Sequence, residues 1–119
     1  MEYKYIKWDE GEPNIITISH DLMSGQAVLS KPTRGRKRRF KQLVKFEAGP
    51  YPDEELLEDA EEAAYLALGF DQFKGKKWDD VASDYNFDEW EGEEAEELCR
   101  ELKEVIRAYW SFRRTNATN

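Results

Sequence analysis

Residues 30–46 read SKPTRGRKRRFKQLVKF and carry eight Lys or Arg side chains without a single Asp or Glu. The whole chain of 119 residues holds 18 Lys and Arg against 26 Asp and Glu, which gives a net charge of −8. Nearly half of the positive charge therefore lies in one short segment of an acidic protein. The conformation of this segment decides the fold, because it joins a strand-forming part of the sequence to a helix-forming part.

The residues before and around this segment favour β-strands. Residues 3–8 suit a strand with aromatic groups on both faces, and residues 15–19 form a β-branched run, which is typical of a half-buried strand. Two more strands are expected over residues 26–31 and 40–47. The basic residues 32–39 lie between the last two strands, so we expect them to form the long loop of a β-hairpin.

The residues after Pro52 favour helices. Asp53 is a good N-cap, and Leu and Ala then recur every three or four positions up to Gly69, which is placed to end the helix. A short helix around residues 78–85 and a long one that includes residues 95–112 are expected to follow. Apolar residues of the long helix have the spacing of a coiled-coil seam, which predicts either a core face or a homodimer contact.

These elements predict an α+β fold in a single domain. A three- or four-stranded antiparallel β-meander over residues 1–47 is followed by three α-helices over residues 53–114, packed on one face of the sheet, and by a frayed tail over residues 115–119. The other face of the sheet is a candidate contact surface and carries Tyr3, Tyr5 and Ile15. The expected core consists of apolar side chains at inward positions, which are Ile6, Trp8, Ile16, Ile18, Val28, Leu43, Phe46, Leu57, Ala64, Leu68, Val81, Leu98, Leu102, Val105 and Tyr109.

Composition narrows the class of protein. Charged residues make up 37% of the chain, yet 4 Trp, 6 Tyr and 6 Phe bury enough surface to predict a folded domain. Cys99 is the only cysteine, which excludes an intrachain disulfide and a cysteine-based zinc site. No stretch approaches the ~18 apolar residues of a membrane span, and residues 1–13 lack the pattern of a signal peptide. We expect a soluble protein of the host cell's cytoplasm, without membrane contact and without a cofactor.

The sequence contains no recognisable catalytic or metal-binding pattern. His20 is the only histidine, Cys99 is expected to be a small buried side chain, and glycine-rich phosphate loops are absent. Asp84, Asn86 and Asp88 fit the first, third and fifth positions of a calcium loop, but the Gly and Glu that such a loop needs at its sixth and twelfth positions are missing. We therefore expect no enzyme activity and no metal site.

Two segments of the chain are strongly acidic. Residues 46–64 and residues 84–97 each carry eight carboxylates and no Lys or Arg. Such runs are commonly solvated helix surface, but closely spaced carboxylates also imitate the phosphates of a nucleic acid. The candidate acidic surface consists of Asp84, Asp88, Glu89, Glu91, Glu93, Glu94 and Glu97.

The basic segment supplies the candidate site for a partner or an anion. Three interpretations remain open: its side chains contact nucleic-acid phosphates, pair with acidic groups of this chain or of another protein, or form a nuclear localisation signal. A surface ion pair contributes only ~0–1 kcal/mol, so pairing for stability alone is a weak reason to gather six cations, and a partner is favoured. The candidate residues are Arg34, Arg36, Lys37, Arg38, Arg39 and Lys41.

We therefore expect a non-enzymatic inhibitor or regulator that acts by protein–protein binding. Small size, acidity and segregated charge are the general profile of proteins that phages or mobile elements direct against host defence nucleases. In this interpretation the protein occludes a nucleic-acid-handling complex. The alternative is a nucleic-acid-binding accessory protein that uses the basic loop over residues 34–41.

Overall fold

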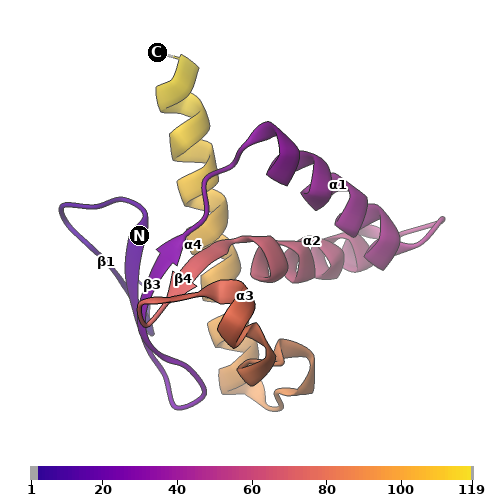
Figure 1. The fold of residues 1–119 in the computed structure, drawn as a ribbon. Coiled ribbons are helices and arrows are strands. Elements are labelled where there is room, and N and C mark those ends of the chain that lie inside the picture. Colours follow the sequence, from indigo (N-terminus) through magenta and orange to yellow (C-terminus); the bar gives the residue numbers. More distant parts are fainter. Residues whose placement is uncertain (1–2, 119) are drawn as a thin grey trace.

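The computed structural model describes the backbone of residues 3–118 and the side chains of residues 3–111. A five-stranded antiparallel sheet in the order β1-β2-β3-β4-β5 packs against a long helix, α4 (Figure 1). The expected α+β class and the antiparallel N-terminal sheet are confirmed. The strands are β1 (Ile6–Trp8), β2 (Ile15–Ser19), β3 (Ser24–Leu29), β4 (Phe70–Phe73) and β5 (Lys76–Lys77).

Strand register places Ile6 of β1 and Ile16 and Ile18 of β2 on the core face of the sheet. Ile6 pairs with Ile18 across the two strands, and both side chains are buried. In β3, Ala27 and Leu29 are buried on the same face, because successive side chains of a strand alternate between its two faces. Val28 lies on the other face, half-buried, so its expected place in the core is wrong.

The basic segment is a helix, α1 (Arg34–Ala48), and the expected hairpin loop and fourth strand are wrong. Thr33 caps its N-terminus, since the Thr33 hydroxyl accepts a hydrogen bond from the Arg36 N–H at 3.2 Å. Gly49 ends it with a positive φ of 80°, which glycine adopts without strain. Between these caps, Arg, Lys, Gln and Leu are all strong helix formers.

Helix α2 (Glu54–Leu68) begins at the expected cap, where the Asp53 carboxylate accepts a hydrogen bond from the Leu56 N–H at 2.8 Å. It packs against α1, and the two helices form a helical hairpin, residues 34–68, that we call the arm. Figure 1 shows the arm extending away from the sheet. The arm is inserted between β3 and β4, and the Ser30 N–H donates to the Gly69 carbonyl at 2.8 Å where the chain leaves and re-enters the sheet.

Two further helices complete the fold, α3 (Trp78–Val81) and α4 (Glu93–Thr118), with short 3-10 turns over Ala82–Asp84 and Phe87–Glu89. There are thus four α-helices where three were expected. The backbone of residues 115–118 is helical, while Asn119, the end of the expected frayed tail, lies outside the described residues.

The expected seam of α4 is a core face. Its members from Ala95 to Tyr109 are buried, and Leu98, Leu102, Val105 and Tyr109 belong to the same apolar cluster as the core side chains of the sheet. The described part of the seam therefore offers no exposed face to a second copy, and the Phe112 side chain lies outside the described residues. The cluster also contains buried side chains that we did not expect, namely Met23, Ala27, Leu29, Leu66, Phe70, Phe73, Trp78, Ile106 and Trp110.

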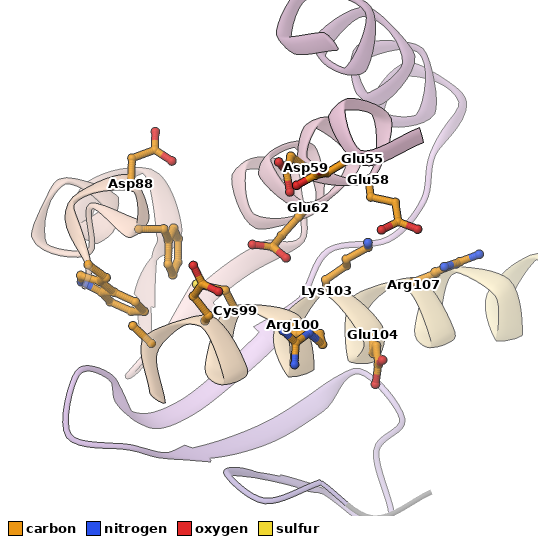
Figure 2. A pocket seen from close by; sticks show the side chains of 14 residues that line it. Glu55, Glu58, Asp59, Glu62, Asp88, Cys99, Arg100, Lys103, Glu104 and Arg107 are labelled. Atoms are coloured by element: carbon orange, nitrogen blue, oxygen red, sulfur yellow. The ribbon is translucent and has the colours of Figure 1, made fainter. Parts of the chain in front are cut away.

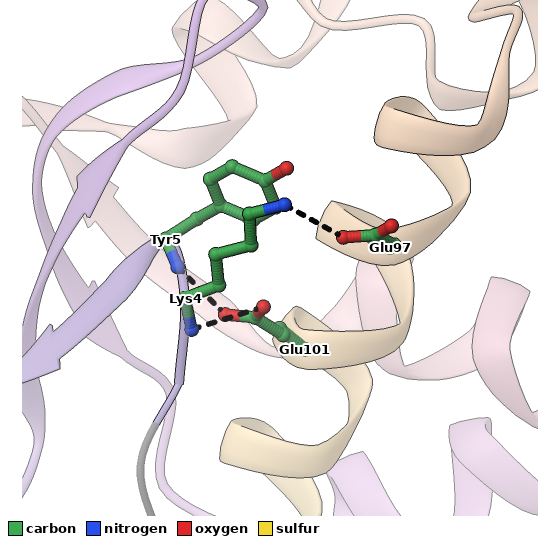
Figure 3. Close-up of polar contacts among 4 residues, drawn as sticks. All are labelled: Lys4, Tyr5, Glu97 and Glu101. Carbon is green, nitrogen blue, oxygen red and sulfur yellow. Dashed lines mark hydrogen bonds and ion pairs between the residues drawn. The ribbon is translucent and has the colours of Figure 1, made fainter.

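Hydrogen bonds to Glu101 and an ion pair with Glu97 hold the segment that precedes β1 against α4 (Figure 3). Glu101 accepts hydrogen bonds from the backbone N–H groups of Lys4 and Tyr5, at 3.1 and 3.0 Å. The Lys4 ammonium also forms an ion pair with Glu97 at 3.5 Å. Since β1 is an edge strand, these contacts hold the edge of the sheet against the long helix.

Replacing Glu101 by Ala is expected to lower the free energy of unfolding by about 1–2 kcal/mol, because two backbone donors lose a charged acceptor. Urea unfolding followed by tryptophan fluorescence measures this change. Glu104→Ala is the control, because Glu104 is exposed on the same helix and makes no hydrogen bond or ion pair with any described residue. Equal effects of the two substitutions would contradict the assigned role of Glu101.

Replacing glycine by alanine is expected to have opposite effects on stability at Gly35, in the arm, and at Gly69, at the base of the arm. A Cβ at Gly69 would lie 2.5 Å from the Ile106 Cδ1 atom and 2.5 Å from the Tyr65 carbonyl oxygen, so Gly69→Ala is expected to destabilise the protein by about 1–3 kcal/mol. A Cβ at Gly35 in α1 meets no atom within 4 Å, so Gly35→Ala is expected to stabilise the protein by about 0.5–1 kcal/mol. Thermal unfolding followed by circular dichroism tests both signs.

Candidate interaction surface

One side of α1 carries a row of exposed cations. Arg34, Arg38, Lys41 and Lys45 follow each other at intervals of four, three and four residues, which places them on the same side of the helix. Lys45 completes this row and was missed in the sequence, because the residues around it were assigned to a strand. Arg39 is exposed elsewhere on the helix.

Two of the six candidate basic residues do not face solvent fully. Arg36 is half-buried, and its guanidinium donates a hydrogen bond to the Leu68 carbonyl at 2.8 Å. Lys37 is also half-buried. Arg36 therefore has a structural role at the base of the arm, where it helps to hold the start of α1 against the end of α2.

The cations of α1 form no ion pair among the residues that the structure describes. The one ion pair between described residues joins Lys4 to Glu97. The basic helix α1 does pack against the acidic helix α2, as the interpretation of pairing within the chain expects, but the described residues form no direct ion pair between the two helices.

The candidate acidic surface borders the arm at Asp88, which lines a pocket together with Glu55, Asp59 and Glu62 of α2. Its residues occupy the two 3-10 turns, the segment that follows them and the start of α4, at the lower end of the molecule in Figure 1, whereas α1 lies at the upper right. All of them are exposed except Glu97, which is half-buried and contacts Lys4. Part of this charge has a structural reason, since carboxylates in the first turn of a helix interact favourably with its N-terminus.

The residues that fit the first positions of a calcium loop lie in separate elements. Asp84 and Asp88 belong to two separate 3-10 turns and not to one continuous loop. Among the described residues, no group of three or more His, Cys, Asp or Glu side chains is arranged to hold a metal ion.

An apolar groove of about 950 Å³ runs along the arm between α1 and α2. Val44 and Ala48 of α1 and Leu57 of α2 line it. Phe46 lines it as well and is 84% exposed, and Tyr51, in the turn at the tip of the arm, is 92% exposed. The expected burial of Phe46 and Leu57 is therefore wrong. A helical interpretation of the segment would have revealed Phe46, because it follows the polar residues 39 and 42 on one side of the helix.

A second cleft, of about 560 Å³, separates α2 from α4 (Figure 2). Carboxylates of α2 line one wall and cations of α4 the other, and Glu58 points toward Lys103. Burial raises the pKa of Glu62 above its usual value; Lys103 opposes this shift and Asp59 adds to it.

Cys99 and His20 both lie at buried positions. Burial, with the nearby Glu62 carboxylate, raises the pKa of Cys99 to about 12, so the thiol stays protonated at neutral pH. His20 is buried, its Nδ1 accepts a hydrogen bond from the Leu22 N–H at 3.0 Å, and its ring packs edge-on against Tyr5. His20 thus stabilises the turn between β2 and β3.

Glu62→Gln is expected to stabilise the protein at pH 7, by less than about 1 kcal/mol because solvent partly screens the site. The folded-state pKa lies above the unfolded value, so the ionised carboxylate costs the folded state free energy at high pH. That cost disappears as the pH falls toward the unfolded value of 4.5. Urea unfolding of both proteins between pH 7 and pH 4 measures the difference, which should shrink with falling pH. Glu58→Gln, at an exposed position of α2, is the control and should give no gain.

Among the described residues, no helix is long and apolar enough to cross a membrane. Comparison with protein-family models, with curated proteins and with solved structures gives no match to this chain. The geometry of the charged surfaces and of the arm is therefore the basis for a functional conclusion.

Proposed function

We propose that this protein is a non-enzymatic regulator that acts by binding another protein. The observation that carries the proposal is that the described residues form one direct ion pair, between Lys4 and Glu97, and none that involves the cations of α1 or the other carboxylates over residues 84–97. Exposed cations on α1 and exposed carboxylates over residues 84–97 are both left available to a partner. Complementary charge on that partner would accelerate association and select against other proteins.

A nucleic-acid-handling protein is the partner class that fits this charge distribution. The nucleic-acid path of such a protein is basic, and the carboxylates over residues 84–97 imitate phosphates in sign and spacing. The cations of α1 then contact an acidic surface beside that path. A protein bound in this way occludes the path, which is the action of an inhibitor that a phage or mobile element directs against a host defence nuclease.

A second candidate function is direct binding of nucleic acid by α1. The row from Arg34 to Lys45 spans ~16 Å at a rise of 1.5 Å per residue. Duplex DNA carries one negative charge per ~1.7 Å of its axis, so a row of this length can face several phosphates. The exposure of these cations on the arm favours this candidate.

Fluorescence anisotropy with labelled single-stranded and duplex DNA and RNA separates the two functions. A protein-binding regulator is expected to leave these oligonucleotides unbound at ~150 mM salt. Micromolar binding that is lost in the variant Arg34→Ala/Arg38→Ala/Arg39→Ala would instead establish the second function. In that case each single substitution, Arg34→Ala, Arg38→Ala or Arg39→Ala, should weaken binding and lower the salt slope by about one.

Affinity capture from a nuclease-treated host lysate then tests the protein partner. The matched variant Asp88→Asn/Glu89→Gln/Glu91→Gln removes three exposed carboxylates near the start of α4. The proposal requires a nucleic-acid-handling protein that the wild type retains and this variant loses. Retention of the same proteins by both would contradict the role of the acidic surface.

A further inference from the structure

The groove along the arm is bordered by positive charge from one helix and by negative charge from the other. We propose that two copies of this chain associate through this side of the arm, with α1 of each copy packed against α2 of its partner. The four helices of the two arms then form a bundle around a two-fold axis. This inference does not depend on the identity of any other binding partner.

The apolar part of the arm is the first reason for an occupant. Phe46 is 84% exposed, Tyr51 92% and Leu57 38%, and Phe46 and Leu57 line the same groove of about 950 Å³ as the aliphatic Val44. Single exposed apolar residues are normal on a protein surface, whereas a contiguous apolar surface with a polar rim marks an interaction site. The groove is therefore suited to a protein surface that brings apolar side chains of its own.

The charges of the rim specify the chemistry of that surface. Arg38, Lys41 and Lys45 of α1 line the groove on one side, and none of them is in an ion pair with a described residue. An occupant that packs along α1 must therefore be acidic next to its apolar residues. Charge complementarity of this kind selects the partner and its orientation.

The chain itself contains an element of this description, α2. Glu61 lines the groove beside Leu57, and Glu54 lies two helical turns before Glu61 on the same side of α2. The basic residues of α1 and the acidic residues of α2 thus lie on the same arm. A two-fold rotation therefore places each α1 against the partner copy's α2, so both contacts form at once and the assembly closes as a dimer.

The net charge of −8 per copy opposes association in general. Solvent-exposed charges more than ~8 Å apart are largely screened at physiological ionic strength, so the charges next to the groove decide the outcome. Arg34 and Arg39 do not line the groove and stay accessible in the dimer, whereas Arg38, Lys41 and Lys45 face the partner copy.

The first experiment measures the mass of the intact protein by sedimentation equilibrium and by light scattering at ~1–100 µM, a range that covers micromolar dissociation constants. The proposal expects a species of twice the 14.0 kDa mass of one chain. A monomer throughout this range overturns it.

Charge reversal then tests the pairing. The variant Lys41→Glu/Lys45→Glu places negative charge on both helices of the arm, and the variant Glu54→Lys/Glu61→Lys places positive charge on both. Each variant alone is expected to be monomeric, whereas an equimolar mixture is expected to form the heterodimer, because each α1 again faces an α2 of opposite charge. Dimers of either variant alone, or two folded variants that stay monomeric when mixed, would overturn the proposed contact.

Phe46→Ser supplies a test that does not depend on charge. Because Phe46 is 84% exposed, its replacement leaves the folded chain intact, which far-UV circular dichroism checks. The proposal expects at least a tenfold weaker dimer. The matched control is Leu22→Ser, an exposed apolar residue in the turn between β2 and β3, away from the arm. Equal effects of the two substitutions would count against the arm as the interface.

Discussion

The fold depends on one buried serine. The Ser30 N–H donates to the Gly69 carbonyl at 2.8 Å, its hydroxyl donates to the Leu68 carbonyl, and its own carbonyl accepts a hydrogen bond from the Trp110 indole at 3.0 Å. Ser30 thus joins the end of β3, the end of the arm and the long helix. Ser30 is buried, so leaving one of its polar groups unpaired would cost free energy. This junction lets two long helices be inserted between adjacent strands without opening the sheet.

Repulsion between the cations of α1 destabilises this helix. Like charges spaced three or four residues apart on a helix repel each other by about 0.2–0.5 kcal/mol per pair, and the row on α1 contains such pairs. Its helix is maintained by the Thr33 cap, by strong helix formers and by the aromatic contact of Phe40 with Tyr65 and Trp110, at ring distances of 4.5 and 5.8 Å. An anionic surface placed against the row relieves the repulsion, which makes binding favourable beyond the contacts themselves.

Sequence periodicity was sufficient where an element is long or strongly patterned. The β-branched run of β2, the Asp53 cap of α2 and the apolar stripe of α4 all predicted what the structure contains. Strands β4 and β5 were missed because each is short and presents few buried side chains; in β4 only Phe70 and Phe73 are buried.

The cations of the basic segment were identified in the sequence, but the helix that carries them was not. Assigning residues 40–47 to a strand hid Lys45 from the row and placed Phe46 in the core. Basic side chains carry little information on conformation, because Lys and Arg are tolerated both in loops and in exposed helices. The decisive residues were Thr33 and Gly49, whose local hydrogen bonds begin and end α1.

The insertion of the arm has a consequence for how this protein can change. Residues 31–68 leave and rejoin the sheet at the hydrogen-bonded pair Ser30 and Gly69, so the arm is an insertion in the sheet. Its inner side packs into the core that it shares with the sheet and α4, where Leu66 is buried, whereas substitutions on its exposed outer surface leave this core unchanged. Such an architecture separates the residues that must be kept for folding from exposed residues that can be exchanged without loss of the fold.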